Sequence, residues 1–352
     1  MRRSFQQITT SLLLLIPILI ESTPVTAQPQ LTISLDIQER LTDVVFRNSN
    51  EGYGLLEEAV WKTTDGGETW TKTWPLVFRP YFTAIATFGE EGMIIGDDHG
   101  ELYVSINPDG EWVTTELTQD EPIIEIEVLD EQHWAALTAS TVFVTDDGGT
   151  TYRQFTPPKG GELSALDITD ASLMHVCESV FYIWRSTDAG KTWNRLDDVE
   201  FSFGTLYDAQ FISADTALVA SWYPWNVFTT FDGGKNWYRS SFDYPTSIAV
   251  ASNGIAAYIG TGFVRLSYNH GKTWVDSISV TDLKIDEKID AWDLQKVIAL
   301  DDNSLILLLS NFEERRSVIA KIKADAPSSV IESGRVIEGE LDLSLLTRPV
   351  GN

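Results

Sequence analysis

One short phrase occurs six times in this chain, and its spacing limits what the chain can fold into. The copies are TTDGGETW (63–70), SINPDGEW (105–112), TDDGGTTY (145–152), STDAGKTW (186–193), TFDGGKNW (230–237) and SYNHGKTW (267–274). Their third residues, all Asp or Asn, are separated by 42, 40, 41, 44 and 37 residues. A period near 41 residues is typical of a four-stranded sheet with its turns, which is the repeating unit of a propeller.

The segments between the copies have the pattern of short β-strands. Each unit opens on an apolar run, such as LTDVVF (41–46) or LYDAQFI (206–212), and two further runs precede the phrase. Short runs that are rich in Val, Ile, Phe and Tyr and end at Gly or Asp are typical of strands. A fourth strand begins at the Trp or Tyr of the phrase, so each unit predicts a four-stranded antiparallel sheet.

A seventh unit without the phrase follows residue 274. Its four apolar runs are WDLQKVIAL (292–300), SLILLLS (304–310), SVIAKIK (317–323) and SVIES (329–333). We therefore predict an all-β fold: a single seven-bladed β-propeller over residues 41–333, with six blades and an appended domain as the alternative. The N-terminal segment 28–40 or the C-terminal tail 334–352 could complete the last blade and close the ring.

Because the phrase lies between the third and fourth strands of a unit, we interpret it as a hairpin turn. Glycine supplies positive φ there, and Asp or Asn accepts hydrogen bonds from nearby backbone N–H groups. Asn107 and Asn269 replace Asp in two copies, which removes the charge that a catalyst or a strong calcium ligand needs. The phrase therefore predicts structural positions: Asp65 and Trp70, Asn107 and Trp112, Asp147 and Tyr152, Asp188 and Trp193, Asp232 and Trp237, and Asn269 and Trp274.

The first 27 residues have the pattern of a secretory signal peptide. Arg2 and Arg3 precede an apolar run at 11–20, and VTA (25–27) offers small residues for cleavage. The apolar run favours the Sec route over the twin-arginine route. We expect an exported protein, periplasmic or secreted, whose mature part is not inserted in a membrane.

The charge of the chain limits its partners. The formal net charge is −27 at pH 7, and cleavage after Ala27 makes it −28 because two Arg and one Glu are lost. Such a surface repels nucleic acid and anionic lipid and suits a basic partner or a salty habitat. Cys177 lies alone in an apolar run and is interpreted as a buried hydrophobe, and the four His residues lack zinc-type spacing. We predict no metal and no cofactor.

The repeated phrase resembles the Asp box, or BNR repeat, and the chain resembles Asp-box β-propellers over residues 40–330. Families with this repeat include sialidases, xyloglucanase-type glycoside hydrolases, sortilin-type receptors and photosystem II stability/assembly factors. A sialidase would carry Arg-Ile-Pro ahead of the first box, whereas this chain has only FRPY (78–81), after it. A xyloglucanase would pair two propellers, and this chain has one.

The assembly-factor group fits best, because its members resemble this chain in length and in the unit at 41–70. The resemblance implies an exported, non-catalytic scaffold that binds another protein, without enzymatic activity. The photosynthetic members carry an arginine-rich patch, and this acidic sequence shows no such cluster. A glycoside hydrolase or carbohydrate-binding propeller remains the alternative, with a glycan as ligand. We expect a monomer with an unidentified protein partner.

The candidate binding face lies opposite the repeated turns, because the outer-to-inner connections and the second-to-third strand turns share one face of a propeller. Trp222, Tyr223 and Trp225 lie in one such turn, where exposed aromatic side chains can anchor a protein or stack on a sugar. Arg79 and Tyr81 lie in one connection of the same class. These five residues are the predicted binding residues, and no catalytic residue is predicted.

Overall fold

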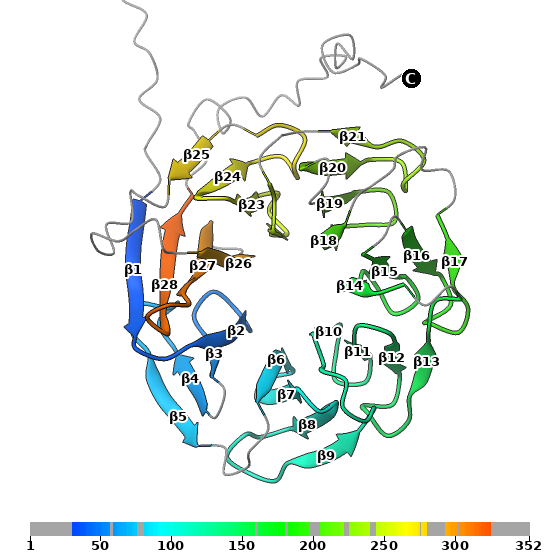
Figure 1. Cartoon of the computed structure of the whole chain (residues 1–352), viewed down its shortest axis with the longest axis horizontal. Coiled ribbons are helices and arrows are strands. Elements are labelled where there is room, and N and C mark those ends of the chain that lie inside the picture. The colour runs from blue at the N-terminus through cyan, green and yellow to red at the C-terminus, as the bar shows by residue number, and fades with distance from the viewer. Residues whose placement is uncertain are drawn as a thin grey trace, which may run out of the picture.

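The fold is a ring of antiparallel β-sheets, shown in Figure 1. The computed structural model describes residues 30–324, except 57–58, 76–80, 159–160, 180–181, 197–204, 222–224, 240–243, 275, 280–292 and 301–302. These residues form seven four-stranded sheets, so the predicted seven-bladed β-propeller is confirmed and the six-bladed alternative is wrong. None of them forms a helix long and apolar enough to span a membrane.

The first four blades run in chain order from the inner to the outer strand. Blade 1 consists of β2 (Leu41–Phe46), β3 (Gly52–Leu56), β4 (Ala59–Thr63) and β5 (Thr71–Pro75). Blade 2 consists of β6 (Phe82–Phe88), β7 (Gly92–Asp97), β8 (Glu101–Ser105) and β9 (Val113–Glu116). Blade 3 consists of β10 (Glu125–Val128), β11 (Trp134–Leu137), β12 (Val142–Thr145) and β13 (Arg153–Phe155). Blade 4 consists of β14 (Leu163–Ile168), β15 (Met174–Glu178), β16 (Tyr182–Ser186) and β17 (Asn194–Arg195).

The next two blades repeat this order, and the last one changes it. Blade 5 consists of β18 (Leu206–Phe211), β19 (Ala217–Ser221), β20 (Asn226–Thr230) and β21 (Tyr238–Arg239). Blade 6 consists of β22 (Ser247–Val250), β23 (Ala256–Gly260), β24 (Phe263–Ser267) and β25 (Asp276–Ser279). Blade 7 consists of β26 (Asp293–Ala299), β27 (Ser304–Asn311), β28 (Arg316–Lys323) and, as its outer strand, β1 (Gln30–Ile37).

The N-terminal strand therefore closes the ring. β1 pairs antiparallel with β28 from Gln30 opposite Lys323 to Ile37 opposite Ser317. The segment 329–333, predicted as the fourth strand of this blade, lies outside the described residues, and β1 occupies the place beside β28. Of the two segments that could complete the blade, the N-terminal one does so.

The hydrophobic core is divided into seven clusters, one at each interface between neighbouring blades. The cluster between blades 7 and 1 joins Leu41 and Val44 to Ile306 and Leu308, for example. The other six clusters join blades 1 and 2, 2 and 3, 3 and 4, 4 and 5, 5 and 6, and 6 and 7. Cys177 is buried in the cluster between blades 4 and 5, where burial raises the pKa of its thiol.

Each repeated phrase forms the turn between the third and fourth strands of its blade. In the first copy, Asp65 Oδ1 accepts hydrogen bonds from the Thr69 N–H (2.9 Å) and the Thr63 hydroxyl (2.8 Å). Gly66 and Gly67 have φ of 72° and 87°, the left-handed region that glycine adopts without strain. The same side-chain acceptor pattern recurs at Asp147, Asp188, Asp232 and Asn269.

The aromatic residue of the turn packs against the preceding blade. Trp70 lies against the cluster between blades 7 and 1, with its ring 5.9 Å from that of Phe46 in an edge-to-face arrangement. The equivalent residues of the other copies, Trp112, Tyr152, Trp193, Trp237 and Trp274, each lie at the interface with the blade before their own. The turn thus orders its own hairpin and also packs its blade against the preceding blade of the ring.

The second copy departs from this pattern. Asn107 Oδ1 accepts from the N–H of Asp109, two residues ahead, instead of four residues ahead. Glu111 stands where four of the other copies carry Thr, and Ser105 Oγ donates to the carbonyls of Asn107 and Glu111. The turn keeps its aromatic contact, since Trp112 Nε1 donates to the Pro108 carbonyl at 3.1 Å.

Candidate binding face

One pocket, the Arg40 pocket, lies on the face opposite the repeated turns. It is lined by Arg40, Tyr81, Ser310, Asn311, Phe312 and Arg315 and has a volume of about 280 Å³. Arg40 follows β1, Tyr81 precedes β6, and Phe312 and Arg315 belong to the turn between β27 and β28. The pocket therefore combines two connections from an outer strand to the next inner strand with one turn between a second and a third strand. The sequence predicted that these two kinds of segment share one face.

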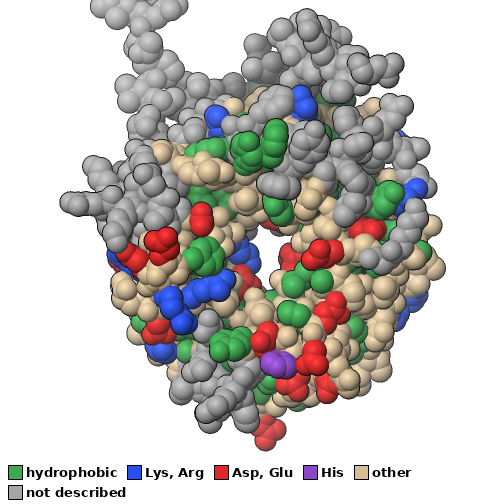
Figure 2. Space-filling model, viewed as in Figure 1, with side chains coloured by type: hydrophobic (Ala, Val, Ile, Leu, Met, Phe, Trp, Pro, Cys, Tyr) green, Lys and Arg blue, Asp and Glu red, His purple; other side chains and the backbone are tan. Residues whose placement is uncertain are grey.

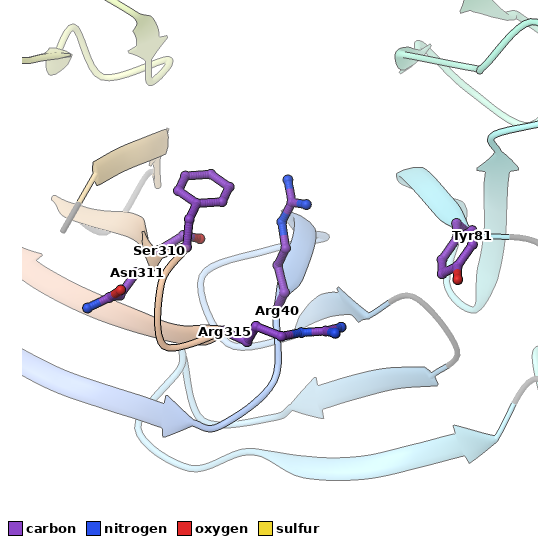
Figure 3. A pocket seen from close by; sticks show the side chains of 6 residues that line it. Arg40, Tyr81, Ser310, Asn311 and Arg315 are labelled. Atoms are coloured by element: carbon purple, nitrogen blue, oxygen red, sulfur yellow. The ribbon is translucent and has the colours of Figure 1, made fainter. Parts of the chain in front are cut away.

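The side chains of the Arg40 pocket are exposed at its rim and buried at its base. Tyr81 is 57% exposed and Phe312 is 49% exposed, whereas Ser310 and Asn311 are buried. The Arg40 guanidinium carbon lies 4.9 Å from the centre of the Phe312 ring, a cation–π distance. Figure 3 shows Arg40 and Arg315 projecting from one side of the pocket, with Tyr81 on the opposite side.

The backbone fixes the two walls of the pocket. The Tyr81 N–H donates to Asp98 Oδ1 at 3.1 Å, and the Asp98 N–H donates to the Tyr81 carbonyl at 3.0 Å. On the other wall, Asn311 Oδ1 accepts from the Glu314 N–H at 3.1 Å and orders the turn. These hydrogen bonds fix Tyr81 on one wall of the pocket and the turn that carries Arg315 on the other.

Charge is unevenly distributed over this face. Figure 2 shows Lys and Arg side chains gathered near blades 7 and 1, while Asp and Glu side chains gather across the central opening near blades 2 and 3. The Arg40 pocket lies in the basic region, although the chain as a whole carries a net charge of −27. A partner of this face would thus meet both signs of charge.

The predicted binding residues fall into two separate places. Tyr81 lines the Arg40 pocket, whereas Trp225 lies in blade 5, where its ring centre is 5.0 Å from that of Tyr244. Arg79, Trp222 and Tyr223 lie outside the described residues. Sequence reasoning missed Arg40, Phe312 and Arg315, and it placed FDYP (242–245) on this face without choosing Tyr244 as a binding residue. The signal for Phe312 was its place in a polar turn, NFEERR (311–316), between the second and third strands of the last unit.

A ring of side chains near the central opening joins each blade to the next. In four blades a carboxylate accepts from the inner strand of the following blade: Asp43 from the Ile85 N–H (3.1 Å), Glu125 from Leu166 (2.7 Å), Asp167 from Phe211 (3.0 Å) and Asp208 from Ile248 (2.8 Å). Thr83 donates to the Ile123 carbonyl at 2.6 Å, and Ser247 Oγ accepts from the Val297 N–H at 3.4 Å. Lys296 completes the ring by donating to Asp43 at 2.6 Å.

Three of these carboxylates, Glu125, Asp167 and Asp208, have raised pKa values, and so does Glu127, which lies on β10 with Glu125. Burial raises the pKa of Asp167 to about 7 and that of Asp208 to about 6. Burial, together with neighbouring carboxylates, raises the pKa of Glu127 to about 8 and that of Glu125 well above its usual range. Burial alone would lower the pKa of Lys296, but Asp43, Glu125 and Glu127 raise it. Carboxyl groups with perturbed pKa values are common at catalytic sites. Here Glu125, Asp167 and Asp208 each accept a backbone hydrogen bond from the following blade, and this structural role accounts for their presence near the opening.

Asp97, Asp98 and His99 form a compact acidic cluster with oxygen and nitrogen atoms within 4.8 Å of one another. Asp97 Oδ1 accepts from the N–H groups of His99 and Glu101, both at 2.9 Å, and Oδ2 accepts from the Tyr103 hydroxyl at 3.1 Å. Asp98 lies 2.7 Å from His99 Nδ1, and this hydrogen bond raises the pKa of the imidazole. Hydrogen bonds within the loop thus account for the arrangement.

Comparison with known proteins identifies the fold and no more. No family model matches the sequence, and no curated protein matches it. Among solved structures, YCF48 bound to a D1 peptide is 14% identical, with a TM-score of 0.65 over 87% of this chain and 97% of that one. YCF48 from Cyanidioschyzon merolae gives 14% identity and a TM-score of 0.62 over 83% and 98%. The WD40 repeats of RRP9 give 10% identity and a TM-score of 0.68 over 85% and 100%.

Proposed function

We propose that this protein is an exported, non-catalytic β-propeller that binds another protein as an assembly scaffold. The observation that carries the proposal is the Arg40 pocket, where two exposed arginines and two exposed aromatic side chains meet on one face. Arg and aromatic residues are enriched at the centres of protein–protein interfaces. A propeller similar in fold, YCF48, has been solved with a D1 peptide, which supports peptide binding as a use of this architecture.

The proposal also covers the identity of the repeated turns and the export of the chain. The turns at 63–70 and its later copies are proposed to be Asp boxes, because they share acceptor geometry as well as sequence. Residues 1–27 are proposed to be a signal peptide on the strength of their sequence pattern alone. Export to the periplasm or the medium follows from the second assignment, and we propose that the exported protein is a monomer.

Site-specific photocrosslinking tests the proposed function. The photoreactive p-benzoylphenylalanine would replace Tyr81 in the full chain, and in a matched variant it would replace Ile106, which is 81% exposed in a repeated turn on the other face. We expect a discrete protein adduct in the source cells from position 81 and not from position 106. Equal adducts at both positions, or none at position 81, would contradict a binding role for this face.

Carbohydrate binding is the second candidate, favoured by the aromatic pair of Trp225 and Tyr244. Tyr244 is 45% exposed, and both residues have positive φ (61° and 49°), a strained conformation for bulky residues. Stacking on a sugar would require the exposed ring of Tyr244. Binding and hydrolysis of a glycan panel by the full chain and by a Tyr244→Ala variant would distinguish the two functions, and we expect neither activity.

A further inference from the structure

We propose that the Arg40 pocket binds a carboxylate of an extended peptide, with Arg40 and Arg315 as its ligands. This inference rests on the proposed function and names the chemistry that the face recognises. A guanidinium group offers donors in a planar fork that matches a carboxylate, and such charge-assisted hydrogen bonds are stronger than neutral ones. Two exposed guanidiniums on one side of the pocket can therefore both offer such donors to a carboxylate bound there.

The charges around the pocket support an anionic ligand. Among the described residues, Arg40 forms no ion pair, and its guanidinium rests on the Phe312 ring. The adjacent Arg316 is different, since its Nε donates to Asp36 Oδ1 at 2.7 Å and its Nη1 lies 4.0 Å from Glu314 Oε2. Asp36 and Glu314 are therefore engaged by Arg316, while Arg40 stays exposed at the pocket.

The backbone at Arg315 also has an unusual conformation, which fixes the direction of this side chain. Arg315 has a φ of 51°, in the left-handed region that Gly or Asn ordinarily adopts at the end of such a turn. A non-glycine residue there costs on the order of 1 kcal/mol of backbone strain. Strained conformations of this kind occur at ligand-binding sites, and in this chain they also occur in the repeated turns, at Ala189 and His270.

The remaining lining residues favour a peptide. Ser310 Oγ is buried without a hydrogen-bond partner among the described residues, so a polar donor lies unused at the base of the pocket. Tyr81 and Phe312 expose apolar ring surface that can cover the neighbouring side chain of a peptide. The volume of about 280 Å³ lies just below the usual range for small-molecule sites and suits one or two residues of a chain that continues across the face.

A peptide array tests the inference. The probe is a set of heptapeptides anchored through their N-termini, each made with a free C-terminal carboxylate and as the C-terminal amide. A third series replaces every Asp and Glu by Asn and Gln. The full chain is compared with R40Q/R315Q and with the matched control K191Q/K235Q, which removes two exposed charges from the opposite face. Thermal unfolding of all three proteins checks that they fold alike.

We expect the full chain and the control to bind a subset of peptides. R40Q/R315Q should bind the same peptides about 100-fold more weakly, with about 10-fold for each single variant, as charged hydrogen bonds predict. Loss of binding in the amide series would identify a terminal carboxylate, and loss only in the Asn/Gln series would identify a side-chain carboxylate.

Three results would overturn the inference. The first is that no heptapeptide binds the full chain, and the second is that R40Q/R315Q binds as tightly as the control. The third is that a uronic acid oligosaccharide displaces the bound peptide and binds more tightly, which would make the ligand a glycan. If R40Q/R315Q still yields the adduct at position 81, only the carboxylate inference fails and the scaffold function stands.

Discussion

At the scale of single residues, a side-chain oxygen at the third position of the repeated turn decides whether the hairpin is ordered. Asp65 accepts from the N–H and the hydroxyl of Thr69, at 2.9 and 2.6 Å. Asn269 reproduces this arrangement with a neutral group, since its Oδ1 accepts from the Thr273 N–H and its Nδ2 donates to the Thr273 hydroxyl. The acceptor, rather than the negative charge, is therefore the common requirement.

Substitution of Asp65 tests this requirement. Asp65→Asn should lower the free energy of unfolding by less than about 0.5 kcal/mol, because Asn keeps the acceptor for the Thr69 N–H. Asp65→Ala removes the acceptor and should cost about 1 kcal/mol, a typical value for an exposed hydrogen bond. Urea unfolding of the two variants beside the original chain measures both. Equal losses for Asn and Ala would show that the charge itself matters.

Sequence could predict these turn residues because each depends only on neighbours within eight positions of the chain. The Arg40 pocket depends on segments that are far apart, since Arg40, Tyr81 and Arg315 meet only when the ring closes. Tyr81 was predicted from its place in a connection, but nothing local in the sequence marks Arg40 as its neighbour. The strained φ of Arg315 is likewise invisible in a sequence, where Arg is unremarkable in a polar turn.

At the scale of elements, the sequence patterns did not decide where β1 lies in the fold. Its alternating run LTISLDI predicts a strand, but strand periodicity does not say which edge the strand will join. The partner β28 could equally have continued into SVIES (329–333), which has the same apolar character. The structure pairs β1 with β28, and Arg316 forms an ion pair with Asp36 at the end of this strand pair.

Removal of β1 should open the molecule. A chain that begins at Glu39 lacks the whole of β1 and leaves β28 with an unpaired edge, which is a template for pairing with another chain. Compared with a chain that begins at Gln28, it should unfold at a lower temperature and form dimers or larger species. Thermal unfolding and light scattering measure both effects. Unchanged stability and a monomer would mean that β1 does not hold the ring closed.

At the scale of the whole molecule, the ring of side chains around the central opening makes stability depend on pH. Folding raises the pKa of Asp167 to about 7 and that of Glu127 to about 8, whereas unfolded carboxyl groups titrate near pH 4. Between these values the folded state binds more protons, so stability falls as the pH rises from about 4 to 8. Asp65 has a pKa of about 2 because its hydrogen bonds to Thr69 favour the carboxylate, so the charge-dependent part of its contribution is lost below about pH 4. Maximum stability is therefore expected at mildly acidic pH.

An Asp167→Asn variant tests the origin of this dependence. Asn can still accept the hydrogen bond from the Phe211 N–H but has no proton to lose. The loss of unfolding free energy between pH 5.5 and 8.5 should be smaller in this variant by about 1–2 kcal/mol. Glu116→Gln on the outer strand β9 removes the same charge at an exposed site and should leave the dependence unchanged. Identical pH profiles for the two variants would assign the effect to net charge instead.

The closure of blade 7 by β1 also fixes the order of events during biosynthesis. Gln30 is among the first described residues to be made, and its partner Lys323 is among the last. Until β28 emerges, the earliest strand has no edge to join and the nascent chain cannot complete its ring, whatever blades have already formed. A contact of such long sequence separation carries a large entropic cost and slows the final folding step. We therefore expect that native structure is reached only after β28 has been made, and that a growing chain halted before residue 316 exposes β1 to proteases and to other chains.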